Sequence, residues 1–317
     1  MSRIIVTGGA GYIGGQTVLQ LLDAGHSVLA IDRSLERNPL QECGAKWLVG
    51  DFAGEVALDA MRTFQPEAII HCAGTSLVGP SMTNPEDCYN NNFVRTKILC
   101  DYLVKHKIAA RLIFSSSAAT YGNPIMIPCQ EVDPAEPISP YGESKLMIEW
   151  MLRAYQQAYG LDYVAFRYFN ACGADSLARH GQRPGATHII ARVLEALRDN
   201  TGAFVLNGTD FETEDGTCVR DYVHVEDLAS AHIRAVNKDI PSGVYNLGTN
   251  TGYSNLQIIH GAIAVTKQDL SYTTGPRRPG DPAMLTADAS KFMSVSGWKP
   301  TYGLEDILRH AWGWYNK

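Results

Sequence analysis

The first half of the chain alternates short apolar, β-branched runs with segments in which apolar residues recur at helical spacing. Ile4-Ile5-Val6, for example, leads through a glycine-rich turn into an amphipathic stretch from Ile13 to Ala24. Such alternation predicts βαβ units with parallel strands and right-handed crossovers. We therefore expect an α/β fold with a doubly wound parallel sheet of the Rossmann type, and ligands at the carboxyl ends of its strands. The predicted strands are Arg3–Thr7, Ser27–Asp32, Lys46–Val49, Glu67–His71, Arg111–Ser115 and Tyr163–Phe169.

After about residue 173 the pattern becomes irregular, and polar loops rich in glycine and proline separate the elements. The helices predicted there are Ile189–Arg198, Asn255–Ala264 and Leu304–Tyr315, and the strands are Phe204–Leu206 and Val244–Leu247. We expect a Rossmann-type domain over residues 1–172 and a smaller mixed α/β substrate-binding lobe over residues 173–317, from which some segments return to the first domain. The sequence has no internal repeat and no low-complexity linker, so we expect the two parts to share one body.

Composition and charge narrow the class of protein. Hydrophobic residues make up 45% of the 317 positions and charged residues 19%, as is typical of globular proteins. A net charge of -6 argues against nucleic-acid binding, which normally needs a basic surface. No apolar run approaches the ~20 residues of a membrane span, and the immediate first strand leaves no room for a signal peptide. The seven cysteines include no Cys-x-x-Cys pair, so we expect reduced thiols, no metal and a cytoplasmic location.

The turn after the first strand has the features of a dinucleotide-binding loop. It consists of Thr7-Gly8-Gly9-Ala10-Gly11-Tyr12-Ile13-Gly14 and opens directly into a helix. Glycine lets the backbone turn sharply and approach a pyrophosphate, to which the helix N-terminus offers free N–H groups. Asp32 ends the second strand, where a carboxylate binds a ribose 2′-hydroxyl, so NAD is favoured over NADP although Arg33 follows it. Asp51 ends the third strand; it either accepts from an adenine amino group or is an ordinary strand-end carboxylate.

A tyrosine and a lysine four residues apart, Tyr141 and Lys145, share one face of a helix predicted from Tyr141 to Tyr159. An isolated tyrosine has a pKa of ~10, and a neighbouring ammonium group is expected to lower that pKa toward the range useful for proton transfer. The fifth strand leads into a serine run that ends at Ser117, at the edge where ligands bind. Its hydroxyl either hydrogen-bonds a reacting oxygen or serves local turn structure. Together the three side chains predict a catalytic site.

These motifs resemble those of the extended short-chain dehydrogenase/reductase superfamily and, within it, the UDP-glucose 4-epimerases. The superfamily shares the glycine loop and the Tyr141/Lys145 pair, whereas residues 213–217 followed by 219–222 are more particular to 4-epimerases. The likeness covers nearly the whole chain. The other segments that carry it are His71-Cys72-Ala73-Gly74, Asn90-Asn91-Asn92, Phe114-Ser115-Ser116-Ser117, Arg167-Tyr168-Phe169-Asn170, Tyr245-Asn246-Leu247-Gly248 and Arg277-Arg278-Pro279-Gly280-Asp281.

The resemblance implies an enzyme that interconverts UDP-galactose and UDP-glucose through a transient 4-keto sugar, with its NAD retained through turnover. It also implies that Tyr141 takes the proton from the sugar 4-hydroxyl, that Lys145 holds the nicotinamide ribose and tunes Tyr141, and that Ser117 hydrogen-bonds the reacting oxygen. Members of the family are commonly dimers through two helices of each subunit. The resemblance therefore implies a homodimer, with 92–106 and 141–159 as the interface helices.

The resemblance also implies two sets of binding residues. The cofactor-binding residues are Gly8, Gly11, Tyr12, Ile13, Gly14, Asp32, Arg33, Asp51, Phe52, Cys72, Ala73, Gly74, Asn92, Ser117, Tyr141, Lys145 and Phe169. The substrate-binding residues are Ser117, Tyr141, Asn170, His188, Val205, Asn207, Arg220, Arg278, Asp281 and Leu285. Arginine forks such as those of Arg220 and Arg278 bind a pyrophosphate well. A lysine that is common in the family shortly after the step that corresponds to Ala73-Gly74 is Ser76 here.

Three other functions stay open. Leu285 stands where a small residue or a tyrosine often borders the sugar pocket, so a C4 epimerase of UDP-N-acetylhexosamines or UDP-pentoses is an alternative. Dehydratases and decarboxylases of nucleotide sugars usually carry an acid after the serine run, where this chain has Ala118, Ala119 and Thr120, which disfavours elimination chemistry. A non-catalytic NAD-binding regulator would not need the intact serine, tyrosine and lysine.

Overall fold

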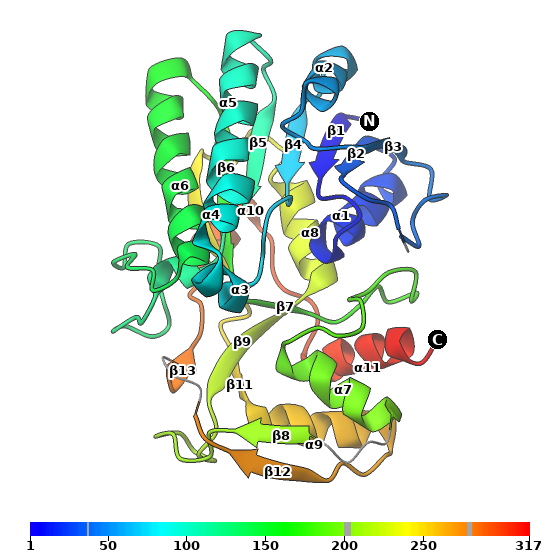
Figure 1. Ribbon diagram of the computed structural model, residues 1–317, viewed down its shortest axis with the longest axis vertical. Helices are drawn as coiled ribbons and strands as arrows, with labels where there is room; N and C mark the ends of the chain where they lie inside the picture. Colours follow the sequence, from blue (N-terminus) through cyan, green and yellow to red (C-terminus); the bar gives the residue numbers. More distant parts are fainter. Residues whose placement is uncertain (37, 200–203, 278–280) are drawn as a thin grey trace.

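The computed structural model describes residues 1–36, 38–199, 204–277 and 281–317. In this part of the chain a seven-stranded sheet has the order β10-β6-β5-β4-β1-β2-β3, and all its strands are parallel (Figure 1). The predicted doubly wound α/β sheet is therefore confirmed, with its switch point between β1 and β4, where the glycine loop lies. The strands are β1 Arg3–Thr7, β2 Ser27–Asp32, β3 Lys46–Val49, β4 Ala68–His71, β5 Arg111–Ser115, β6 Tyr163–Tyr168 and β10 Gly243–Leu247.

Helices cover both faces of this sheet and enclose two apolar cores. On one face, residues of α1, α8 and α10 pack against strand residues such as Val6 and Phe166. On the other face, residues of α2, α5 and α6 pack against Ile5 and Leu112. Figure 1 shows α5 and α6 side by side along the sheet. The helices are α1 Tyr12–Asp23, α2 Glu55–Phe64, α3 Val78–Thr83, α4 Pro85–Tyr89, α5 Arg95–Lys105, α6 Pro140–Tyr159, α8 Val225–Arg234 and α10 Ser290–Ser296, with a π-helical segment η1 Asn90–Val94 and a 3-10 segment η2 Ala118–Tyr121.

The helix that carries the tyrosine–lysine pair, α6, has strong end signals. The Ser139 hydroxyl accepts a hydrogen bond from the Gly142 N–H at 3.2 Å, and Pro140 occupies the first helical position. Gly160, with a φ of 71°, ends the helix in the left-handed conformation. A Cβ on Gly142 would lie only 2.4 Å from the carbonyl oxygen of Ala119, so glycine allows the first turn of α6 to pack directly on η2. Tyr141 is thereby held against the turn that ends β5.

A smaller lobe lies below the large sheet in Figure 1. Its apolar core joins α7, α9 and α11 with residues of β8 and β9 such as Leu206 and Tyr222. One sheet of the lobe has the order β11-β9-β13, with β7 also paired to β9, and β12 pairs with β8. Its elements are β7 Asn170–Cys172, α7 Ile189–Asp199, β8 Phe204–Asn207, β9 Val219–His224, β11 Gly252–Ser254, α9 Asn255–Thr266, β12 Tyr272–Gly275, β13 Met284–Leu285 and α11 Leu304–Tyr315.

Two sequence expectations differ from the structure. The strand predicted at residues 244–247 was grouped with the second lobe, but as β10 it pairs with β6 and extends the large sheet, because Tyr245 and Leu247 pack into the same core as α1 and α8. The helix predicted over residues 92–106 begins instead as the π-helical η1 and continues as α5. In the part of the chain that the structure describes, no helix combines the length and apolar character needed to cross a membrane.

Candidate active site

The glycine loop between β1 and α1 forms a close-fitting backbone cradle. Gly8 has a φ of 70°, and a Cβ there would lie 2.8 Å from the backbone nitrogen of Ala73. A Cβ on Gly14 would lie 2.1 Å from the Gly8 carbonyl oxygen. The Asp32 carboxylate accepts a hydrogen bond from the Ala10 N–H at 3.0 Å, which ties the loop to the end of β2. The cradle leaves room for a pyrophosphate at the N-terminus of α1.

We expect Gly14→Ala to weaken NAD binding by about one to two orders of magnitude, because the methyl group must displace the Gly8 carbonyl at a cost of about 1–3 kcal/mol. Titration of the cofactor-free protein with NAD measures the effect. Gly313→Ala is the matched control, since a Cβ on this residue of α11 meets no atom within 4 Å. Equal NAD affinity of the Gly14 variant and the wild type would contradict the fit of the loop.

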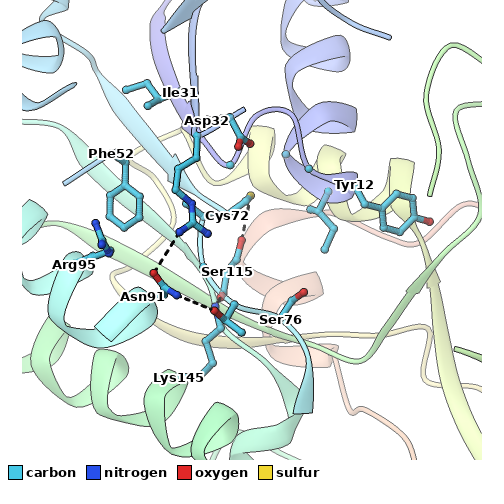
Figure 2. A pocket seen from close by; sticks show the side chains of 18 of the residues that line it. Tyr12, Ile31, Asp32, Phe52, Cys72, Ser76, Asn91, Arg95, Ser115 and Lys145 are labelled. Atoms are coloured by element: carbon cyan, nitrogen blue, oxygen red, sulfur yellow. Dashed lines mark hydrogen bonds between the residues drawn. The ribbon is translucent and has the colours of Figure 1, made fainter. Parts of the chain in front are cut away.

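A cavity of about 380 Å³ extends from this loop along the carboxyl edge of the sheet. In Figure 2, Asp32 and Lys145 lie on opposite sides of the pocket, and the Cys72 and Ser115 side chains lie between them. The pocket gathers side chains from the ends of several strands, as expected at a switch point. The predicted cofactor residues that line it are Gly8, Gly11, Tyr12, Ile13, Gly14, Asp32, Arg33, Asp51, Phe52, Cys72, Ala73, Gly74, Tyr141 and Lys145.

The end of the cavity near Asp32 is bordered by polar side chains from two directions. Arg33 donates a hydrogen bond to the Asn91 side-chain oxygen at 3.4 Å, and the Asn91 amide donates to the Thr75 hydroxyl at 3.4 Å (Figure 2). The Asp51 carboxylate forms an ion pair with Arg95, which also lines the cavity. Asp51 is therefore more than an isolated strand-end carboxylate, since it helps to build the wall of the pocket.

Two of the three predicted catalytic side chains, Tyr141 and Lys145, line the other end of the cavity, and the third, Ser117, lies next to Tyr141. Tyr141 and Lys145 are buried, with 9% and 5% of their surfaces exposed. The Lys145 ammonium nitrogen donates to the Ser115 carbonyl at 2.9 Å and lies 5.7 Å from the centre of the Tyr141 ring. Ser117 caps η2, where its hydroxyl accepts from the Ala119 N–H at 3.1 Å, and it also hydrogen-bonds Tyr141. The serine thus serves both the turn and the site.

The electrostatics of the pair differ from the sequence expectation. Burial raises the pKa of Tyr141 above its usual value, and the hydrogen bond with Ser117 only partly opposes this rise. Burial lowers the pKa of Lys145 to about 8. The expected lowering of the tyrosine pKa by the ammonium group is therefore wrong for the protein without its cofactor, because desolvation of the phenolate dominates.

Asn92, Ser117 and Phe169 were also assigned to the cofactor, but they are not among the residues that line the cavity. Asn92 lies behind the pocket wall, where its oxygen accepts from the Thr75 N–H at 2.7 Å and its amide donates to the Ser144 hydroxyl at 2.8 Å. It therefore joins the loop after β4 to the catalytic helix. Phe169 belongs to a small apolar cluster, described below with Leu285.

Several predicted substrate residues are already engaged with protein groups. The Asn170 amide donates to the Asp221 carbonyl at 2.8 Å. Arg220 forms an ion pair with Asp281, which neutralises part of the charge expected for a pyrophosphate. The His188 ring hydrogen-bonds the Gln182 side chain, and burial lowers its pKa to about 4, so it is neutral at physiological pH. Val205 and Asn207 lie on β8. Arg278 lies outside the described residues.

Leu285 connects the second lobe to the catalytic end of the cavity. It lies on β13, which pairs with β9 opposite Arg220. Its side chain packs against a buried cluster that includes Ala118 and Tyr121, which belong to η2, and Phe169. Because η2 begins directly after Ser117, Leu285 packs on the segment that follows the catalytic serine.

Comparison with known proteins agrees with this geometry. The sequence pattern of the NAD dependent epimerase/dehydratase family matches residues 4–248, more than half of the chain. The chain belongs to this family. The UDP-glucose 4-epimerase of Halalkalibacterium halodurans is 42% identical over 99% of this chain and 96% of its own length. The UDP-glucose 4-epimerase of Lactobacillus helveticus is 41% identical over 99% and 97%.

Solved structures agree as well. A UDP-glucose 4-epimerase from Brucella ovis in complex with NAD superposes with a TM-score of 0.93 at 37% identity, covering 99% of this chain and 98% of that one. One from Stenotrophomonas maltophila, with bound NAD and formylated UDP-arabinopyranose, superposes with a TM-score of 0.94 at 31% identity, covering 100% and 98%. NAD, predicted from Asp32, is therefore confirmed as the cofactor.

The structure adds pocket residues that the sequence did not single out. Asn91, Ser115 and Ser116 lie in motifs that carry the family resemblance, next to the predicted site residues Asn92 and Ser117. Gln182 lies in none of these motifs, so nothing in the sequence indicated that it would reach the cavity from an irregular loop far along the chain. The Trp314 side chain donates to the backbone carbonyl of Gln182 at 2.8 Å. Tyr168 also lies in one of these motifs, and Ser76 is the position noted above for its missing lysine. The other added residues are Ile31, Gly50, Thr75, Arg95 and Ala171.

Proposed function

We propose that this protein is an NAD-dependent 4-epimerase that interconverts UDP-galactose and UDP-glucose through a transient 4-keto sugar. The observation that carries the proposal is the position of Tyr141 and Lys145 in the wall of a cavity that also contains the glycine loop and Asp32, with Ser117 hydrogen-bonded to Tyr141. The names of the most similar relatives, which are UDP-glucose 4-epimerases, support the same substrate.

The cofactor-lining residues fit NAD. The glycine loop and the N-terminus of α1 would hold the pyrophosphate, and Asp32 would accept from the adenosine ribose. Lys145 would donate to the nicotinamide ribose. NAD, when bound, supplies the acceptor and donor for the hydride of the sugar. The protein supplies the orientation of the sugar and the handling of its proton.

In this mechanism Tyr141 accepts the proton of the sugar 4-hydroxyl and returns it when the 4-keto sugar is reduced on its other face. Ser117, which is hydrogen-bonded to Tyr141, donates to the same sugar oxygen and keeps it in line with the phenol. The Lys145 ammonium group, fixed by the Ser115 carbonyl, stabilises negative charge that develops on Tyr141. Burial of the pair strengthens these electrostatic interactions by excluding water.

The second lobe is proposed to bind the UDP part and to set the sugar range. Arg220 and Arg278 would hold the pyrophosphate. We therefore propose that, when a substrate binds, Arg220 either leaves its ion pair with Asp281 or contacts Asp281 and the pyrophosphate together. Asn170, His188, Val205 and Asn207 complete the proposed UDP site. We propose that residues 1–172 form the cofactor-binding region and residues 173–317 the substrate-binding region. β10, α8 and α10 are the segments of the second region that return to the first.

The decisive experiment incubates the purified protein, without added cofactor, with UDP-galactose and follows the sugars by NMR. Appearance of UDP-glucose without net NADH supports epimerisation with retained NAD. Loss of water or carbon dioxide from a nucleotide sugar would instead support elimination, for which residues 118–120 offer no acid. No conversion of UDP-galactose, UDP-hexosamines or UDP-pentoses with added NAD would leave only an NAD-binding protein.

We expect Leu285→Ala to raise the kcat/KM for UDP-N-acetylgalactosamine relative to UDP-galactose by about tenfold or more, because removal of buried methyl groups opens space next to η2. Initial rates with both substrates measure the ratio. Met284→Ala is the matched control, since this neighbour on β13 is 39% exposed. An unchanged ratio would mean that Leu285 does not border the sugar.

We also propose a homodimer in the cytoplasm. The predicted interface helices, α5 and α6, expose the apolar side chains of Ile98 and Trp150, while Leu99, Leu103 and Leu152 are core residues. This exposure supports a contact between copies along these helices. All seven cysteines are free thiols, which supports a reducing compartment.

A further inference from the structure

A buried ion pair lies directly behind the catalytic side chains. It joins Glu149, on α6, to Arg167, on β6, whose side chains are only 3% and 6% exposed. The contact is bidentate: Arg167 Nε donates to Glu149 Oε1 at 3.0 Å and Arg167 Nη2 donates to Glu149 Oε2 at 2.6 Å. Glu149 follows Lys145 by one helical turn and therefore shares its face of α6. The mechanism above assigns no role to this pair.

The carboxylate of the pair also holds the turn that carries the catalytic serine. The Ser116 hydroxyl donates to Glu149 Oε1 at 2.5 Å. Ser116 stands between Ser115, whose carbonyl accepts from Lys145, and Ser117, which hydrogen-bonds Tyr141. The same carboxylate thus links the helix that carries the base to the turn that carries its partner.

The guanidinium group supports the other end of the same short segment. Its carbon atom lies 4.7 Å from the centre of the Tyr121 ring, and the Tyr121 hydroxyl donates to the Asn246 side-chain oxygen at 2.7 Å. Tyr121 is the last residue of η2, and Ser117 comes directly before the first. The ion pair therefore contacts both ends of this segment, through Ser116 at one end and Tyr121 at the other. The remaining terminal nitrogen of Arg167 is buried without a hydrogen-bond partner among the described residues.

Stability alone is a weak reason for such a pair. Burial of two charges costs desolvation free energy that their attraction only partly recovers, and apolar side chains of similar volume often stabilise a core equally well. The Glu149 carboxylate, both of whose oxygens accept hydrogen bonds, is instead suited to fix a single arrangement of the groups that donate to it.

We propose that the Glu149–Arg167 pair is a positioning device for the epimerisation step, which holds Ser117 at one fixed place relative to Tyr141 and Lys145. The inference rests on the proposed function for the reaction, but the geometry it describes exists in the protein without substrate.

The test replaces both charges at once with Glu149→Met and Arg167→Met, so that no unpaired charge stays buried. We expect kcat to fall by about 10-fold to 100-fold, as for a small misplacement of reacting groups, while KM and bound NAD change by less than about twofold. Ser116→Ala, which keeps the ion pair intact, is expected to show a smaller fall of about three- to tenfold. This milder variant provides the test if the double variant does not fold.

The matched control is a second arginine–carboxylate pair, which joins Arg111, at the start of β5, to Asp162, directly before β6, at the amino ends of these strands. Replacing both residues with Met and Leu is expected to lower the melting temperature but to leave kcat unchanged. A wild-type kcat in the Glu149/Arg167 variant, or an equal loss of kcat in the control, would overturn the proposal.

A second readout does not depend on turnover. Ionisation of Tyr141 is followed by ultraviolet absorbance, as the difference between each protein and its Tyr141→Phe counterpart. Because the Ser117 hydrogen bond lowers the pKa of Tyr141, we expect this ionisation to move to higher pH in the pair variant and not in the control. If the wild type converts no UDP-sugar, the proposed function fails while this titration still decides the positioning role; an unmoved titration overturns that role.

Discussion

Tyr141→Phe is expected to reduce kcat for UDP-galactose by about 10²-fold to 10⁴-fold, the usual range for loss of a general acid–base group. The phenylalanine ring fills the same buried space, so the fold, the bound NAD and KM should change little. What disappears is the oxygen that accepts the sugar proton. The Ser117 hydroxyl stays in place because the Ala119 N–H still donates to it, but it loses its hydrogen bond with Tyr141.

The measurement is the initial rate of UDP-glucose formation, together with the NAD released from each protein by denaturation. Tyr245→Phe is the matched control: this tyrosine is 2% exposed and its hydroxyl donates only to the Pro241 carbonyl, on the edge strand β10. We expect it to keep the wild-type rate. Near wild-type turnover by the Tyr141 variant would remove the tyrosine from the mechanism and revive the non-catalytic hypothesis.

The large sheet could be read from the sequence because its strands are short, β-branched and separated by helices of regular period. The ends of β1, β2, β3 and β5 agree with the predicted ranges. The sequence analysis expected some later segments to return to the first domain but did not single out β10, because sequence order does not show which sheet edge a late strand joins. The packing of Tyr245 and Leu247 against the main core shows that β10 is one of them. The π-helical turn η1 was not predicted either; its residues Asn91 and Asn92 contact Arg33 and Thr75, and such contacts leave no mark in the local sequence pattern.

The site was predictable where motifs are local and not where it depends on distant contacts. The glycine loop, Asp32 and the Tyr141/Lys145 pair each have a spacing that physical chemistry requires, and the structure places them around one cavity. The direction of the tyrosine pKa shift was not predictable, because it depends on how much water burial removes. Gln182 enters the cavity through the packing of its loop against Trp314, a contact between residues far apart in the sequence.

Lys145 is the second residue whose loss should have a very large effect. Lys145→Met removes both the charge that stabilises the Tyr141 phenolate and the donor for the nicotinamide ribose, so we expect kcat to fall by about 10²-fold or more and bound NAD to decrease as well. The NAD loss separates this variant from Tyr141→Phe. Retention of both NAD and activity would show that the contact with the Ser115 carbonyl has only a structural role.

The pH dependence of the same residue gives a sharper test. Burial lowers the pKa of Lys145 to about 8, so the active ammonium form is present below that pH and is lost as the pH rises through it. We therefore expect kcat of the wild type to decline on the alkaline side near pH 8. A guanidinium group stays charged throughout this range, so Lys145→Arg should turn over more slowly, because its larger head fits the site poorly, but should show no decline there. An alkaline decline that persists unchanged in Lys145→Arg would show that another group titrates. That group, and not Lys145, would then carry the charge that supports Tyr141.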